Sequence, residues 1–453
     1  MVTCWVVLYA AAIPTMTACA EPLSVATFQA DVTPPLGSPL FFGIVPKAKR
    51  VVDPLTARGV VLLVKPKPIV LCAVDWIGIA NDSYDTWRSA LAEAAGTTPD
   101  HVALQVVHQH EAPGSDVQVE ALLAARGLSG RMYDPAFDHE ALARAARAIR
   151  ACLREPQTVT TLGIGMAKVD KVASSRRLLA PDGTLKCERL SWCEDPEIRA
   201  AEEGLIDPYV RLVSFWDNDR PVASLMYYAC HPQSFYRRGA INADFVGLAR
   251  GLRQSTIPDA LHVYFTGAAG NVATGKYNDG GSPPRRFDFA ARLADGMTRA
   301  WEAQEKYPIA SADVQWKVRT VRVPLREGWT ETSFLKELDD EGLDVPLRIR
   351  AARNLVWVRR CEEEGAVIDL TCLHVGEAKI LHLPGEPFVE YQLAAQKMSP
   401  EAFVCVAGYG DYGPGYIGTA VAYEQGGYET GPVSRVAPGV ESILMSAMRE
   451  LLR

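Results

Sequence analysis

The sequence of 453 residues lacks the features that mark several specialised classes of protein. It has no long run rich in lysine and arginine and no strip of aromatic and basic residues, and its formal net charge is −7. No nucleic acid is therefore expected as a partner. It has no internal repeat, no low-complexity linker and, beyond its first twenty residues, no apolar run long enough to span a membrane. The composition is that of an ordinary globular protein with a large core.

The ten cysteines include no C-x-x-C pair, so neither a zinc knuckle nor a disulfide scaffold is indicated. Cys187 and Cys193 lie close enough in the sequence to pair if the protein is exported. Cys72, Cys230 and Cys405 lie in apolar, strand-like runs and resemble small buried hydrophobic residues. The cysteines therefore leave the compartment open.

The first twenty residues differ from the rest of the chain. Residues 2–13 are apolar and uncharged, and Ala18 and Ala20 give an A-x-A-like cleavage site, so residues 1–20 are predicted to be a signal peptide. Residues 16–19 also resemble a lipoprotein box, which would anchor Cys19 through lipid. A secreted or periplasmic location is expected. No lysine or arginine precedes the apolar run, so a mis-assigned start codon or a buried strand remains an alternative.

Short β-branched runs alternate with amphipathic or alanine- and arginine-rich stretches, which predicts an α/β protein with mixed β-sheets and flanking helices. Because the chemically informative segments come from the front, middle and end of the chain, one large domain over residues 21–453 is expected. Strands are predicted at 59–64, 69–79, 102–107, 210–215, 222–228, 262–265, 314–323, 368–375 and 379–383. Helices are predicted at 82–95, 135–154, 287–306, 331–339, 347–364, 388–396 and 440–452.

Histidines follow two of the apolar runs. His108 and His110 end the run that begins at residue 102, and the period of two along a strand would direct both side chains to one side, where they can share a metal. His231 ends a second run before Pro232. Asp244 then opens a helix-like stretch and is either its N-cap or an acceptor for a histidine N–H. A chance surface pair and a core histidine are the alternatives.

A carboxylate and a tyrosine-rich loop follow the later strands. Glu386 comes after a strand and a Pro-Gly turn, and one carboxylate with two imidazoles is an ordinary zinc donor set. The alternative is a helix-start glutamate favoured by the macrodipole. Residues 409–429 are dense in glycine and tyrosine, whose hydroxyls can bind a metal or donate to an oxyanion. A rigid aromatic surface loop is the alternative there.

One segment imitates a phosphate-binding loop. Residues 270–276 match G-x-x-x-x-G-K, but Tyr277 stands where serine or threonine would hold magnesium, and the glycines and prolines that follow cannot continue a helix. No nucleotide is therefore expected as a partner.

Taken together, these segments resemble the neutral/alkaline non-lysosomal ceramidase family. Residues 31–37 (DVTPPLG) resemble the opening of that family, and residues 108–114 (HQHEAPG) are similar to its H-T-H-S-G-P-G. Residues 230–232 (CHP) resemble its second histidine segment, and residues 267–272 are loosely similar to its S-N-x-G-D-V loop. Residues 384–386 (PGE) resemble its P-G-E, and residues 416–429 its Y-x-T…Y-E, all in the order of the family.

The resemblance implies a zinc ion held by His108, His231, Glu386 and Tyr416. It implies that His110 and Tyr428 are catalytic and lie opposite the zinc around the substrate carbonyl. It also implies that Arg176 lines the substrate site, because Ser175-Arg176 resembles an N-R pair of the family, and Asp244 is assigned to the substrate side with it.

The function expected from this resemblance is zinc-dependent hydrolysis of a linear amide, in N-acylsphingosine or another N-acyl amide, by a zinc-activated water. A lipid-like substrate and contact with a membrane surface would follow. Residues 266–270 lack the serine of the family, and the chain continues for few residues after its last predicted helix, so no C-terminal immunoglobulin-like domain is expected and ceramide itself is in doubt. The alternatives are a zinc hydrolase of esters or small peptide-like amides, and a non-catalytic binding protein that retains the fold.

Overall fold

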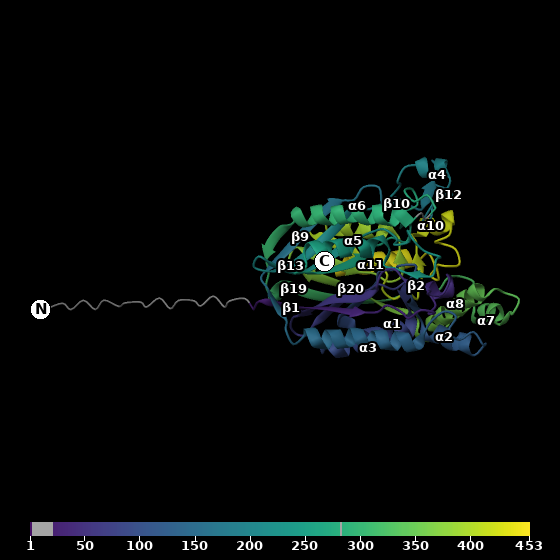
Figure 1. The fold of residues 1–453 in the computed structure, drawn as a ribbon, viewed down its shortest axis with the longest axis horizontal. Coiled ribbons are helices and arrows are strands. Elements are labelled where there is room, and N and C mark those ends of the chain that lie inside the picture. The colour runs from purple at the N-terminus through teal and green to yellow at the C-terminus, as the bar shows by residue number, and fades with distance from the viewer. Residues whose placement is uncertain (2–20, 281–282) are drawn as a thin grey trace.

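The computed structural model describes residue 1 and residues 21–280 and 283–453. The predictions of a signal peptide and of a lipid anchor at Cys19 fall on residues 2–20, outside the described residues. Figure 1 shows strands lying between α3 on one side and α6 on the other. Three large sheets form the body of the fold.

The first sheet packs against helices α1 (Asn81–Ala95) and α3 (Pro135–Cys152). Its strand order is β6 (Val102–Val106), β4 (Ile69–Val74), β3 (Thr56–Leu63), β1 (Leu23–Asp31) and β8 (Gln157–Val159). β4 and β6 are parallel, and the other neighbours are antiparallel. All six residues of β4 are buried, as expected of a strand covered on both faces.

The second sheet is covered by α5 (Asp244–Thr256) and α6 (Pro283–Glu302). Its order is β16 (Leu261–Thr266), β14 (Arg220–Tyr228), β13 (Tyr209–Asp217), β9 (Thr161–Lys168) and β18 (Glu305–Pro308), with β14 and β16 parallel. Contacts of β16 with β4 and β6, and of β14 with β1, join it to the first sheet. One continuous apolar core therefore lies between two sheets and two pairs of helices.

The third sheet has the order β19 (Val314–Arg322), β20 (Val367–Val375), β21 (Ala378–His382) and β23 (Phe403–Ala407), with β21 and β23 parallel. Helices α9 (Val389–Met398) and α11 (Val440–Leu451) pack on it, and β23 contacts β14.

Shorter elements complete the structure. The helices are α2 (Val117–Ala124), α4 (Pro196–Ala200), α7 (Glu331–Asp339), α8 (Val345–Glu364) and α10 (Ala420–Gln425). The strands are β2 (Arg50–Val51), β5 (Gly78–Ile79), β7 (Gly114–Ser115), β10 (Ser174–Ser175), β11 (Arg177–Leu179), β12 (Leu185–Glu188), β15 (Ala240–Ile241), β17 (Val272–Ala273), β22 (Glu386–Pro387) and β24 (Tyr416–Ile417).

Helix ends follow the local chemistry of the sequence. Asp134 caps α3 by accepting from the backbone N–H of Phe137, and Pro135 occupies the first turn. Asp116 caps α2 in the same way through Val119. Gly96 ends α1 in the left-handed region that glycine adopts without strain.

The predicted α/β class, with mixed sheets in a single domain, is confirmed by this architecture. The strand expected over residues 69–79 is in fact two strands, β4 and β5, separated by a bend. Every described cysteine is a free thiol, including Cys187 and Cys193, whereas Cys72, Cys230 and Cys405 are buried as expected.

In the part of the chain that the structure describes, no helix has the length and apolar character needed to cross a bilayer.

Candidate metal centre and active-site cavity

The predicted donors follow the carboxyl ends of strands that belong to parallel pairs. His108 and His110 come after β6, His231 after β14, and Glu386 after β21. β6 runs parallel to β4 in the first sheet, β14 to β16 in the second, and β21 to β23 in the third. Ligands in open α/β sheets bind outside such strand ends. The fold therefore brings segments from three sheets to one place.

The two histidines of the H-x-H pair are close, but not for the reason that the sequence suggested. β6 ends at Val106, and His108 has a φ of 74°, which is outside the extended region. The period of two along a strand therefore does not apply. The rings of His108 and His110 nevertheless lie 4.8 Å apart, edge to face, and both are buried. A left-handed residue at 108 stores backbone strain of the kind found at functional sites.

Three donor atoms face one another at hydrogen-bond distances. His108 Nε2 lies 3.1 Å from His231 Nε2, and Glu386 Oε2 lies 3.2 Å from the former and 3.1 Å from the latter. The Tyr416 hydroxyl lies 3.5 Å from His231 Nε2. All four side chains are buried. The structure thus brings the four predicted metal donors together.

Backbone pairing fixes the carboxylate beside the tyrosine. Glu386 and Tyr416 are register partners in the two-residue parallel pair of β22 and β24. Gly385 precedes this pair with a φ of 58°, and a β-carbon there would lie 2.4 Å from the carbonyl oxygen of Gly415. Glycine is therefore required for the close approach of the two strands. The Tyr412 hydroxyl donates to Glu386 Oε1 from the same loop.

The second nitrogen of each histidine faces a backbone carbonyl. His108 Nδ1 lies 2.5 Å from the oxygen of Ile77, and His231 Nδ1 lies 2.9 Å from the oxygen of Ala269. Because a carbonyl only accepts, the ring proton belongs on Nδ1, and each Nε2 presents a lone pair to the centre. His110 Nδ1 lies 3.3 Å from the oxygen of Pro232.

Burial controls the charge of these groups. It lowers the pKa of His231 to about 4, and the positive charge of Arg176 acts in the same direction. Burial also places the pKa of His110 well below its ordinary value, so this imidazole is neutral at physiological pH.

These donors fit a metal ion. Zinc binds imidazole and carboxylate donors at about 2.0–2.2 Å, which places donors roughly 3.3–3.5 Å apart at the corners of a tetrahedron. The observed separations of 3.1, 3.1, 3.2 and 3.5 Å are close to these values. Glu386 Oε2 has no hydrogen-bond partner within the described residues, although it is buried. Lone pairs that face one another in this way are stabilised by a cation.

His110 belongs to a second possible ligand set. In the described part of the chain, ligand nitrogens of His108, His110 and His231 all lie within 4.8 Å of one another. The histidine cluster can therefore hold a metal either with all three imidazoles or with the carboxylate and phenol in place of one.

Arg176 and Tyr428 lie next to these donors. Arg176 donates to the Tyr416 hydroxyl at 2.9 Å and to the carbonyl of Gly270 at 3.0 Å, and it is itself buried. The ring of Tyr428 stands edge-on to that of Tyr416 at 5.7 Å. Burial raises the pKa of Tyr428, so its phenol keeps its proton at neutral pH.

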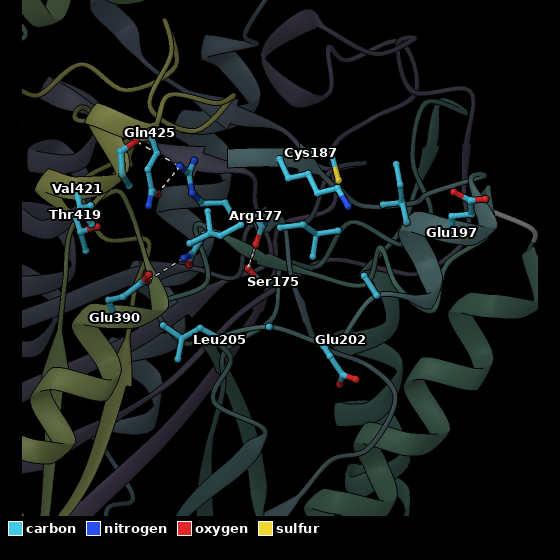
Figure 2. A pocket seen from close by; sticks show the side chains of 18 residues that line it. Ser175, Arg177, Cys187, Glu197, Glu202, Leu205, Glu390, Thr419, Val421 and Gln425 are labelled. Atoms are coloured by element: carbon cyan, nitrogen blue, oxygen red, sulfur yellow. Dashed lines mark hydrogen bonds between the residues drawn. The ribbon is translucent and has the colours of Figure 1, made fainter. Parts of the chain in front are cut away.

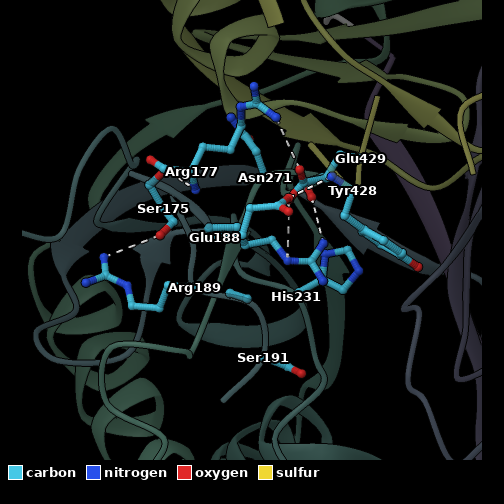
Figure 3. Close-up of polar contacts among 12 residues, drawn as sticks. Ser175, Arg177, Glu188, Arg189, Ser191, His231, Asn271, Tyr428 and Glu429 are labelled. Atoms are coloured by element: carbon cyan, nitrogen blue, oxygen red, sulfur yellow. Dashed lines mark hydrogen bonds and ion pairs between the residues drawn. The ribbon is translucent and has the colours of Figure 1, made fainter. Parts of the chain in front are cut away.

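A buried ion pair supports the loop that carries Tyr428. Arg177 Nη1 lies 3.3 Å from Glu429 Oε2 (Figure 3). The backbone N–H of Tyr428 donates to Glu188 at 2.7 Å. Strands β11 and β12 are thereby tied to the tyrosine-rich loop near residue 428.

Asp244, in contrast, does not line the cavity that contains the donors. It is the first residue of α5, and its carboxylate accepts from the hydroxyl and N–H of Ser234 and from the N–H of Phe235. The described contacts of this carboxylate include no histidine nitrogen. Asp244 therefore fixes the loop that follows His231, rather than facing a substrate.

The donors lie at the base of a cavity of about 330 Å³. His108, His110, Glu386, Tyr416, Arg176 and Tyr428 all line it, whereas His231 lies behind them, fully buried. Sequence reasoning missed Tyr236, Tyr412 and Arg353 on its wall. It also missed Tyr409, whose hydroxyl lies 3.1 Å from His231 Nδ1. The tyrosine density from residue 409 onward was the one sequence signal for Tyr409 and Tyr412, and no such signal marked Tyr236 or Arg353.

A larger cavity, of about 720 Å³, contains none of the predicted metal donors. Arg177, Cys187 and Glu390 line it (Figure 2). Leu179, 49% exposed, and Val421, 55% exposed, give its lining an apolar part. Arg176 lines the metal-donor cavity, whereas the next residue, Arg177, lines this larger one.

Fold and site together define an α/β protein with a buried histidine, carboxylate and tyrosine centre at the base of a cavity. No family model matches the sequence, and no curated protein sequence matches it either. Two solved structures match 95% of the chain. One, described as a ceramidase complexed with C2, has a TM-score of 0.71 at 16% identity over 75% of its own chain. The other, neutral ceramidase from Pseudomonas aeruginosa, has a TM-score of 0.68 at 17% identity over 74% of its chain.

The expected resemblance to neutral ceramidases is therefore confirmed at the level of the fold.

Proposed function

We propose that this protein is a zinc-dependent hydrolase that cleaves a linear amide bond in an N-acyl amide. One observation carries the proposal: His108, His231, Glu386 and Tyr416 direct electron-rich atoms to one point at separations of 3.1–3.5 Å. The likeness of the fold to structures described as ceramidases supports the reaction class. Ceramide is one candidate substrate within that class.

The residues of the chain supply the groups that such a reaction needs. When bound, zinc would polarise a carbonyl and lower the pKa of a water molecule. Arg176 holds the Tyr416 hydroxyl in place through its 2.9 Å hydrogen bond. His110 is neutral and buried, so it can accept a proton at one nitrogen and later pass it to the leaving amine.

Tyr428 is proposed as the donor to the developing oxyanion, because it lines the same cavity and its phenol stays protonated. Arg176 is proposed to line the substrate site beside it. Asp244 is proposed to position the loop after His231. Secretion and contact with a membrane surface remain predictions from the sequence.

The test combines metal analysis with an assay of N-acyl amide hydrolysis. We expect one zinc per chain, loss of activity on chelation and recovery on adding zinc. His108→Ala should lose zinc and lower kcat/KM by more than the about 10–100-fold that loss of an outer partner of a metal ligand costs. His139→Ala, at an exposed position of α3, is the matched control and should leave both unchanged.

The proposal fails if His108→Ala keeps full activity and stoichiometric zinc. Activity on matched esters but not on amides would favour hydrolysis of a different bond. A protein that binds zinc only at trace occupancy and hydrolyses neither would favour the non-catalytic alternative.

A further inference from the structure

The cavity above the metal donors carries an excess of positive charge. Five arginines line it: Arg176, Arg237, Arg350, Arg353 and Arg435. Within the described residues Glu386, already assigned to the metal, is the one acidic side chain that lines it. A concave site lined by charge of one sign concentrates ligands of the opposite sign.

Two arginines of this set, Arg176 and Arg435, are buried. Arg176 lies 3.8 Å from Glu429, whereas Arg435 pairs with neutral groups. Arg435 donates to Asn354 Oδ1 at 3.0 Å and to the carbonyl of Gly413 at 2.9 Å. Burial and the nearby charge of Arg353 lower the pKa of Arg435 to about 9, so it stays charged at neutral pH. No carboxylate in the described residues lies within 4.0 Å of its guanidinium.

Two further cavity arginines, Arg353 and Arg237, lie against aromatic rings. The guanidinium carbon of Arg353 lies 3.9 Å from the ring centroid of Phe42, and that of Arg237 lies 5.5 Å from the ring centroid of Tyr236. Stacking of this kind fixes the plane of a guanidinium and leaves the N–H groups on its edge available. The described part of the chain gives Arg237, Arg350 and Arg353 no ion pair with a carboxylate.

Asp116, an acid close enough to feel the charge of Arg353, already has other partners. Arg353 influences the pKa of Asp116 through its charge, but the carboxylate of Asp116 accepts from Asn81 at 2.8 Å and from the N–H of Val119 at 3.3 Å. It therefore caps α2 and leaves the arginine edge open to the cavity.

The same cavity has apolar walls. Phe41, Ile44, Leu190, Ile349 and Val433 line it beside the arginines. Hydrocarbon and guanidinium surfaces side by side fit an amphiphile with one apolar chain and one anionic group. A substrate with hydrocarbon on both sides of its amide would remove water from these arginines and give them no partner, which is unfavourable.

We propose that the substrate is an N-acyl amide with an acidic group, a carboxylate or a phosphate, on its amine side, bound by Arg237, Arg350 and Arg353. An N-acyl amino acid is the simplest member of this class. The acyl side is hydrocarbon and takes the apolar wall, so the amine side is the part that can present charge to the arginines. This inference rests on the proposed amide hydrolysis and names its substrate class.

The test compares pairs of substrates in which one member carries an acidic group and the other does not. N-lauroylglycine and N-lauroylglycinamide have nearly equal size, and we expect kcat/KM to be at least tenfold higher for the acid. Raising the ionic strength from about 0.05 to about 0.5 M shortens the range of charge interactions and should lower kcat/KM for the acid but not for the amide. N-lauroyl phosphoethanolamine against N-lauroylethanolamine identifies phosphate, rather than carboxylate, as the acid.

Arginine variants test whether Arg237, Arg350 and Arg353 cause the higher kcat/KM for the acidic substrate. Arg237 and Arg350 are exposed, so Arg237→Gln and Arg350→Gln should fold normally and each lower the acid-to-amide ratio of kcat/KM about threefold, as exposed charge contacts do. Arg353→Gln, at a less exposed position, should lower it about tenfold. Arg147→Gln, on the exposed face of α3, is the control and should leave the ratio unchanged.

Failure of this inference is distinguishable from failure of the proposed function. Hydrolysis of both members of each pair with no preference for the acid, or a preference that the three arginine variants leave intact, overturns the acidic substrate while amide hydrolysis stands. If zinc-loaded protein hydrolyses none of the four compounds and no ceramide, the proposed function fails and the inference fails with it.

Discussion

Replacing Arg250 by methionine removes one half of a fully buried ion pair. Arg250 extends from α5 over the second sheet, whereas Asp75 follows β4 of the first. Nη1 lies 2.8 Å from Oδ1 and Nη2 lies 2.7 Å from Oδ2, and the side chains are 4% and 0% exposed. Asp75 also accepts from Thr56 and from Gln109, the residue between the two cavity histidines.

Removal of one partner of a buried pair costs roughly 3–5 kcal/mol of unfolding free energy, because the other charge stays buried. Arg58 lies close enough to lower the pKa of Asp75 through its charge, so it compensates in part. We therefore expect Arg250→Met to lose about 3 kcal/mol at pH 7. The surface pair of Lys65 and Glu21, whose side chains are 82% and 65% exposed, is the control, and Lys65→Met should cost less than about 1 kcal/mol.

The loss should depend on pH. Burial alone would raise the pKa of Asp75, but Arg250 outweighs it, so the pKa in the folded protein is lowered. The pair therefore stabilises the protein above the unfolded pKa of about 4, and that contribution fades as the pH falls through the folded value. The difference between wild type and Arg250→Met should be largest at neutral pH and shrink on acidification.

Urea unfolding followed by circular dichroism at several pH values measures this difference. The double variant Arg250→Met with Asp75→Asn should regain much of the lost stability, because it removes the buried carboxylate charge. A single variant that loses less than about 1 kcal/mol, or a double variant no more stable than the single one, would refute the reasoning.

Three further predictions concern the site and its support. Burial raises the pKa of Asp116 to about 6, above its unfolded value of about 4. The stability of the folded protein therefore falls as the pH rises from about 4 to about 6 and the buried carboxyl group ionises. Asp116→Asn should raise the urea midpoint relative to wild type at pH 8 but not at pH 4. Gly270→Ala would place a β-carbon 2.4 Å from the backbone oxygen of Glu386 and should abolish zinc retention on gel filtration, whereas Gly251→Ala, with open space around it, should retain zinc. Tyr409→Phe removes the hydroxyl beside His231 Nδ1 and should weaken zinc binding about tenfold in a competition titration with a chelator. The urea midpoint of the zinc-free protein should not change.

Most of the strands that sequence reasoning found are rich in β-branched and apolar residues. β9 was missed because glycine is disfavoured in strands, yet Gly163 and Gly165 lie within it. A β-carbon at Gly165 would lie 2.1 Å from the carbonyl oxygen of Ala300, so the glycine lets α6 approach the sheet. That requirement exists only in the tertiary structure. β1 was also missed, although its composition is ordinary for a strand, and β23 was noted only as the strand-like surroundings of Cys405.

The two histidine donors and Glu386 were within reach of the sequence because each follows an apolar strand, a position that the local pattern reveals. Which tyrosine of the loop joins them was not, since Tyr409, Tyr412, Tyr416 and Tyr428 all stand in similar glycine-rich surroundings. The choice of Tyr416 came from the family resemblance alone. Arg353 lies in α8, where an arginine is usually solvated; only the packing of that helix against Phe42 places it in the cavity.

The pairing of β22 with β24 has a consequence for biosynthesis. Glu386 can pair with Tyr416 only after Tyr416, the last of the proposed donors in the chain, has been translated. Domains of a nascent chain acquire structure from the amino terminus onward. The proposed four-donor site is therefore complete only after residue 416 has been translated, and a product truncated before that residue would lack the proposed tyrosine donor.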